Sequence, residues 1–196
     1  SSRTMAHKLT RNGIEWVVAA TLMDDRTGVA VDGLLSNTGC TRLLVCTAVN
    51  DTLWSVDPDG SKILTTVTRE TRRRYRWSTH PTNLDQLILV TENVAHLYEW
   101  RSLTRLTQDS GIQLVGSVIP ELAIRSIVSC FDGNVIASTF TNSEASRSKS
   151  KLILWNSSDF TPGAKAAAPI PDYQPLADHV EHIIGIYGHR LVFLHQ

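Results

Sequence analysis

An apolar run, a short break and a second apolar run that carries a tryptophan recur three times along this chain. The three copies occupy residues 42–57, 86–100 and 134–156. A fourth copy opens at residues 190–195. The copies are spaced by roughly 44, 48 and 56 residues, close to the ~40–50 residues of one blade of a propeller. A repeat of this length predicts an array of small sheets.

Turn signals divide each repeat into strands. A β-prone run precedes each copy, and the pair Asp132-Gly133 between two such runs is typical of a hairpin, because glycine takes the positive φ of a tight reversal. Short runs at residues 62–68 and 103–107 follow two of the tryptophan strands. Stacking four-stranded meanders covers both their faces and their edges. We therefore predict an all-β fold, a β-propeller portion of about three to four antiparallel blades in an incomplete ring.

The repeat also sets the expected domain boundaries. Residues 1–28 are an N-terminal segment with a strand from a preceding or closing blade. Residues 29–70 and 71–110 are one blade each, and residues 111–175 are a blade with loop insertions. Residues 176–196 begin a truncated blade, so remaining blades or domains of a longer chain are expected as its partners.

Composition narrows the class of protein. With 42% hydrophobic and 19% charged residues, the chain can bury a sizeable core. No window is apolar enough to span a membrane and the N-terminus lacks a secretory pattern, so we expect a cytoplasmic protein without a membrane partner. A formal net charge of zero argues against nucleic acid. Its three cysteines, Cys40, Cys46 and Cys130, contain no C-x-x-C pair and are predicted to be buried free thiols.

Two resemblances follow from particular residues. Residues 126–139 look like the first hairpin of a WD-repeat blade, and residues 51–54 and 152–156 look like its tryptophan strand. The repeats are degenerate, because Ser55, Arg101 or Asn156 follows the tryptophan where the family has aspartate. Residues 76–81 and 179–196 resemble the C-terminal propeller region of fungal NACHT-type, NLR-like signalling ATPases. That resemblance implies a sensor or partner-binding role, with the nucleotide held by another domain.

Catalytic and cofactor motifs are absent from the sequence. It contains no G-x-x-x-x-G-K-[ST], G-x-G-x-x-G, H-E-x-x-H or G-x-S-x-G, so we predict no catalytic residue and no cofactor. His179 and His182, with His189 and His195, are the best metal candidates. Residues three apart on a strand face opposite sides, so we predict no metal site there.

Candidate contact residues lie in the arginine-rich run 69–77. Arg72, Arg73, Arg74 and Arg76 could meet an acidic partner, or they could be solvated residues of a connection between blades. Trp54, Trp100 and Trp155 are predicted to be structural core residues between blades, since they recur at one place in the repeat.

These features favour a non-catalytic protein-interaction or scaffold module whose rim loops bind a protein partner. The alternative is a β-propeller hydrolase or a lectin-like sugar binder. That alternative needs carboxylates that converge, and its candidates are Asp24, Asp25, Glu92 and Asp132.

Overall fold

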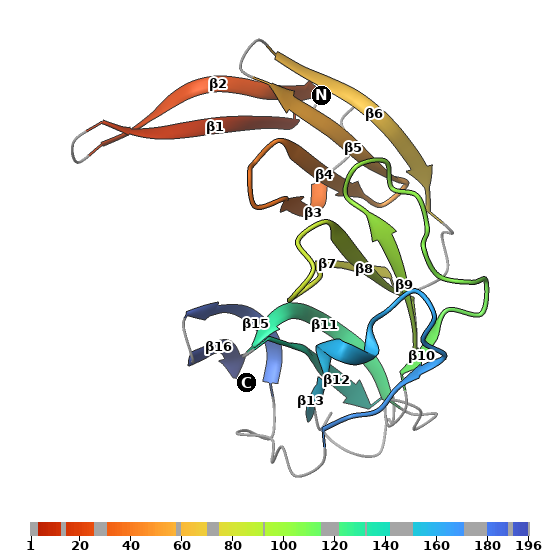
Figure 1. Cartoon of the computed structure of the whole chain (residues 1–196). Coiled ribbons are helices and arrows are strands. Elements are labelled where there is room, and N and C mark those ends of the chain that lie inside the picture. The colour runs from red at the N-terminus through yellow and green to blue at the C-terminus, as the bar shows by residue number, and fades with distance from the viewer. Residues whose placement is uncertain are drawn as a thin grey trace. The chain divides into compact units, whose positions relative to one another are not determined.

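The computed structural model describes residues 4–12, 15–25, 31–57, 60–69, 75–91, 93–114, 122–131, 133–141, 151–170, 180–187 and 190–195. These residues form strands, turns and one short 3-10 helix, η1 (Ser157–Asp159), and they contain no α-helix. The chain divides into two compact units, Ser1–Thr71 and Arg72–Gln196 (Figure 1). The predicted all-β class with antiparallel sheets is therefore confirmed. Within neither unit do the described sheets close into a barrel or a ring.

The first unit holds a hairpin and a four-stranded sheet. Strands β1 (Thr4–Asn12) and β2 (Glu15–Asp25) pair antiparallel with each other. The sheet has the order β3-β4-β5-β6, so it is an antiparallel meander within the predicted segment 29–70. Its strands are β3 (Val31–Ser36), β4 (Arg42–Thr47), β5 (Asn50–Asp57) and β6 (Gly60–Thr68).

The residues that turn the chain between β4 and β5 differ from those that the sequence favours for a turn. Asn50 and Asp51 read as turn residues in the sequence, but they begin β5, and the reversal falls on Ala48 and Val49. The Thr47 hydroxyl oxygen accepts the N–H groups of Val49 (3.3 Å) and Asn50 (3.0 Å). This local side-chain bonding supports the turn two residues earlier, because one hydroxyl oxygen accepts two backbone donors. Asp51 is thereby placed in the sheet.

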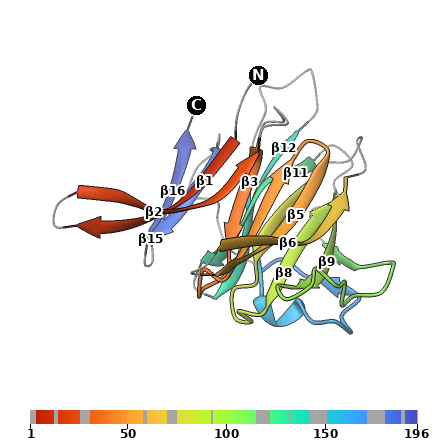
Figure 2. The same ribbon diagram turned by 90° about the horizontal axis from the view of Figure 1, so that it is seen from above.

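The second unit is built from three sheets. A five-stranded sheet has the order β14-β10-β9-β8-β7, a three-stranded sheet has the order β11-β12-β13, and β15 pairs with β16. Only the short pair β10–β14 runs parallel among the described pairs of this unit. The antiparallel course of β8 and β9 is visible in Figure 2. The strands are β7 (Tyr75–Thr79), β8 (Gln86–Thr91), β9 (Val94–Glu99), β10 (Ile112–Leu114), β11 (Leu122–Phe131), β12 (Asn134–Thr141), β13 (Lys151–Trp155), β14 (Ala166–Ala167), β15 (Val180–Tyr187) and β16 (Arg190–His195).

The first strands of these three sheets are neighbours. Strand β11 lies beside β7 and also beside β15. Successive hairpins of the unit therefore meet through their leading strands. The turn between β11 and β12 contains Gly133 with φ 74°, as the Asp-Gly pair predicts.

The fourth strand expected at residues 103–107 is not formed. Leu103 has φ 53°, which breaks an extended run, and Arg105 makes only an isolated bridge with Tyr98. Strand β10 pairs with β9 instead, and Gly111 allows this pairing. A Cβ at Gly111 would lie 2.4 Å from Val94 Cγ1, and the backbone of Gly111 has φ 60°. Strands β10 and β14 lie within the segment 111–175, which the sequence predicts as a separate blade, but they join the sheet of β7–β9.

The main core of the second unit lies between its five-stranded and three-stranded sheets. Apolar side chains from β8, β9, β10 and β14 pack with others from β12, β13 and the segment after it. Full burial of one such side chain stabilises the fold by roughly 1.5–3 kcal/mol, so this cluster contributes to holding the two sheets together. The cluster consists of Ile88, Val90, Ala95, Leu97, Ile112, Leu114, Val135, Trp155, Phe160 and Ala167.

Candidate binding pocket

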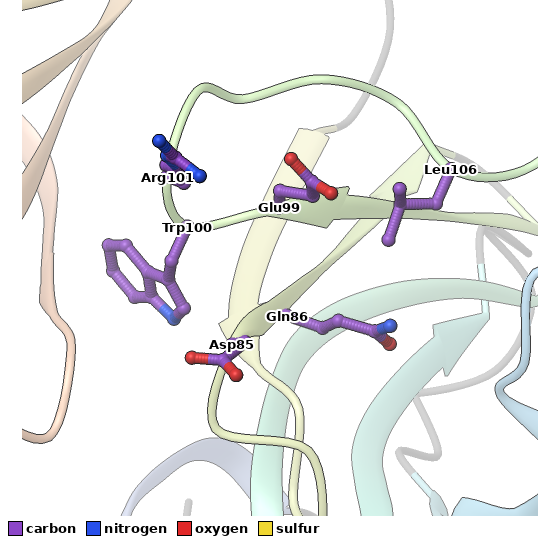
Figure 3. Close-up of a pocket in the computed structure, with 6 residues that line it drawn as sticks. All are labelled: Asp85, Gln86, Glu99, Trp100, Arg101 and Leu106. Atoms are coloured by element: carbon purple, nitrogen blue, oxygen red, sulfur yellow. The ribbon is translucent and has the colours of Figure 1, made fainter.

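A pocket of about 370 Å³ lies where β8 begins and β9 ends. We call it the Trp100 pocket (Figure 3). The antiparallel register pairs Gln86 with Glu99, which brings the residues just outside each strand together. The backbone N–H of Trp100 donates to the Asp85 carbonyl oxygen over 2.9 Å and closes this end of the sheet. The lining residues are Asp85, Gln86, Glu99, Trp100, Arg101 and Leu106.

The turn from β7 to β8 carries Asp85 and is ordered by a buried histidine. Nδ1 of His80 accepts the backbone N–H groups of Thr82 (3.2 Å) and Asn83 (3.0 Å). Asn83 then accepts the Asp85 N–H on its side-chain oxygen (3.2 Å) and the Gln86 N–H on its carbonyl (3.0 Å). The wall of the pocket on this side is therefore fixed by hydrogen bonds before any ligand arrives.

The same histidine ties the turn to the segment after β13. With Nδ1 used as an acceptor, the neutral ring carries its proton on Nε2, which donates to the carbonyl oxygen of Phe160 over 3.0 Å. Burial lowers the pKa of His80, although the Phe160 carbonyl opposes this shift. A proton on Nδ1 would face two N–H donors. The folded protein therefore favours neutral His80.

This arrangement predicts that stability falls in mild acid. The unfolded chain binds a proton on His80 near pH 6.5, whereas the folded chain resists it. The folded chain therefore keeps its full stability above that pH. Its free energy of unfolding decreases as the pH falls from 6.5 toward the lower pKa of His80 in the folded state. Urea unfolding at about pH 7.5 and about pH 5.5 should show a larger loss of stability in the parent than in His80→Gln. Equal losses in the two proteins would contradict the assignment.

The opposite wall is a tight loop after β9. The Leu103 N–H donates to the Glu99 carbonyl over 2.9 Å, and the Glu99 N–H donates to the Thr104 carbonyl over 3.0 Å. The buried Leu103 side chain anchors the loop, even though its backbone has a positive φ. The Ser102 hydroxyl donates to Glu99 Oε2 over 3.3 Å. Both ends of the loop are thus held in place around Glu99.

The charge in the pocket is acidic. Asp85 is exposed and Glu99 is half-buried, and neither carboxylate forms an ion pair with a lysine, arginine or histidine among the described residues. Figure 3 shows the Arg101 guanidinium at the outer edge of the loop, apart from Asp85 and Gln86. The Trp100 side chain is 4% exposed, and its indole N–H finds no acceptor in the part of the chain that the structure describes. The pocket therefore offers two carboxylates and the Gln86 amide oxygen as acceptors, and the Trp100 indole N–H and the Arg101 guanidinium as donors.

The predicted arginine contacts fall mostly outside the described residues. Arg72, Arg73 and Arg74 lie there, while Arg76 is exposed on β7. Arg69, at the start of the same run, is not a solvated residue. Its Nε donates to Asp51 Oδ1 over 3.0 Å, and the two side chains are 11% and 0% exposed.

The three repeated tryptophans differ in burial. Trp155 is fully buried and belongs to the core between the two sheets. Trp100 is buried beside the pocket, and Trp54 is half-buried against Leu43 and Val45. The Trp54 indole N–H is buried without a hydrogen-bond acceptor. The three positions are therefore not equivalent in their surroundings.

Cys40 and Cys46 differ in burial. Cys46 is buried and forms no disulfide, as predicted, but Cys40 is exposed in the turn after β3 with φ 51°, so the prediction of burial is wrong there. That turn is held by Asn37, which accepts the N–H groups of Thr41 and Arg42, and it leaves Cys40 outside the apolar strands. The described side chains contain no cluster of three metal-ligating groups. The side chains of Cys130, His179, His182, His189 and His195 lie outside the described set, as do Asp24, Asp25, Glu92 and Asp132.

Comparison with known proteins gives no family for this chain. It matches no protein-family model and no curated protein. No helix among the described residues is long and apolar enough to cross a membrane.

The pocket is not evident from the sequence. Asp85 and Glu99 are ordinary surface residues in the sequence, and Trp100 reads only as a core residue. The available signal was the pairing of the two apolar runs 86–91 and 94–99 across a short turn. That pairing places the residues before the first run next to those after the second.

Proposed function

We propose that this chain is a non-catalytic protein-interaction module of WD-repeat-like blades, the partner-binding part of a larger cytoplasmic NACHT-type signalling protein. Small antiparallel sheets that meet through their leading strands support the repeat architecture. Loops at the ends of such sheets are the usual place for binding, because a rigid scaffold positions them. Arg72, Arg73, Arg74 and Arg76 remain candidate contacts in this proposal.

The observation that carries the proposal is the preformed loop end of the β7–β9 sheet. Hydrogen bonds fix both walls of the Trp100 pocket, so a partner would meet a surface that needs little ordering. Beside it, Leu84 is 61% exposed in the turn that carries Asp85. An exposed apolar side chain at the rim of a polar pocket is a suitable anchor for a protein partner.

Affinity capture tests this proposal with matched baits. The parent chain, Leu84→Ser and Ile63→Ser are used to capture proteins from a lysate of the source cells. Ile63 is 50% exposed on β6, so its replacement removes similar apolar surface elsewhere. We expect a partner whose recovery falls about tenfold with Leu84→Ser, as for an interface anchor, and is unchanged with Ile63→Ser. If no protein is lost selectively with Leu84→Ser, the loop end is not the binding surface.

A further inference from the structure

We propose that the Trp100 pocket receives a lysine or arginine side chain of the partner, an inference that rests on the function proposed above. The ligand is then a basic segment of polypeptide. It enters between the turn that carries Asp85 and the loop that follows Glu99.

Two carboxylates and one guanidinium line the pocket, so its formal charge is net negative, and this selects the charge of the ligand. Asp85 and Glu99 come from different segments, yet both line one concave site. The net negative charge of the site attracts a cation and repels a phosphate or carboxylate. A lysine or arginine head group donates charge-assisted hydrogen bonds to carboxylates. Gln86 adds a side-chain amide oxygen as a further acceptor on the same wall.

The buried indole indicates the rest of the ligand. Because only 4% of the Trp100 side chain is exposed, it presents no open face on which a sugar ring could stack. Trp100 nevertheless lines the pocket, and its indole N–H has no acceptor among the described residues. In Figure 3 the indole nitrogen lies on the side of the ring near Asp85. A peptide carbonyl satisfies this donor while its side chain reaches the carboxylates, so a polypeptide fits both requirements.

The pocket chemistry is tested with small probes on the whole chain. The ¹H–¹⁵N signal of the Trp100 indole is followed during titration with Nα-acetyl-arginine amide or Nα-acetyl-lysine amide. Nα-acetyl-citrulline amide has the shape of the arginine probe without its charge. We expect the two cationic probes to shift this signal in a saturable way. The citrulline probe should bind at least about fivefold more weakly, because it cannot make the charge-assisted contact. Equal binding of citrulline would overturn the inference.

Isosteric variants locate the effect. Asp85→Asn and Glu99→Gln keep the size of each side chain, and the glutamine keeps an oxygen for Ser102. Each variant should weaken the binding of the cationic probes about fivefold or more. Asp109→Asn removes an exposed carboxylate outside the pocket and should change nothing. If Asp85→Asn and Glu99→Gln bind the probes as the parent does, the carboxylates do not form the site.

The same variants separate this inference from the proposed function. A partner that is lost with Leu84→Ser but retained with the double variant Asp85→Asn/Glu99→Gln would leave the interaction module standing and overturn the cation site. Specific probe binding with no partner captured would support the cation site and contradict the proposed function. Loss of the partner both with Leu84→Ser and with Asp85→Asn/Glu99→Gln supports the proposed function and the cation site together.

Discussion

Replacing Trp155 by alanine is expected to lower the free energy of unfolding by about 3–5 kcal/mol. Trp155 is fully buried at the end of β13, and its indole belongs to the core that joins the three-stranded sheet to the five-stranded sheet. Truncation removes both the buried apolar area and the contacts across that interface, and the surrounding strands can close the cavity only in part. The effect should appear in urea unfolding followed by far-ultraviolet circular dichroism.

Trp54→Ala is the control for this prediction. Trp54 occupies the equivalent place in its repeat, but it is half-buried and its indole N–H has no acceptor. Its removal loses less apolar area and also relieves an unsatisfied donor, so we expect less than half of the Trp155 effect. If both variants lose the same stability, position in the repeat determines the energetic role. If Trp155→Ala is as stable as the parent, Trp155 is not a core residue.

The features of the fold that could be predicted from sequence are those encoded locally. The apolar runs 42–49, 86–91 and 134–140 became β4, β8 and β12, because strands buried on both faces or at a sheet centre need nearly continuous apolar side chains. The Asp-Gly pair also marked its hairpin, since Gly133 supplies the positive φ. The identity of a strand and its pairing in a hairpin can thus be predicted from about twenty consecutive residues.

Long-range pairing was not readable. Strand β14 has only two residues and joins β10 across more than fifty positions of sequence, and neither segment has an alternating pattern long enough to predict it. The Trp100 pocket could not be predicted for the same reason, because it is formed by two loops that become neighbours only when β8 and β9 pair. The role of His80 depends likewise on Phe160, eighty residues away.

Replacing Asp51 by alanine is expected to destabilise the first unit by about 3–5 kcal/mol. Asp51 is fully buried at the start of β5, where it accepts a hydrogen bond from Arg69 Nε over 3.0 Å. Arg69 follows β6, and its N–H donates to the Val49 carbonyl over 2.8 Å, so the backbone holds the guanidinium close to the carboxylate. Loss of Asp51 removes this carboxylate from a mostly buried arginine, so less of the desolvation cost of that charge is offset.

Two further variants decide whether the buried charge is the cause. Asp51→Leu combined with Arg69→Met removes both charges, and it should recover most of the stability that Asp51→Ala loses, because apolar residues of similar size often replace a buried pair without penalty. Asp109→Ala removes a carboxylate that is 94% exposed and paired with Arg105 on the surface, and should leave urea unfolding unchanged. If the double variant is no more stable than Asp51→Ala, the packing of Asp51 and Arg69, rather than their charge pairing, holds β5 and β6 together.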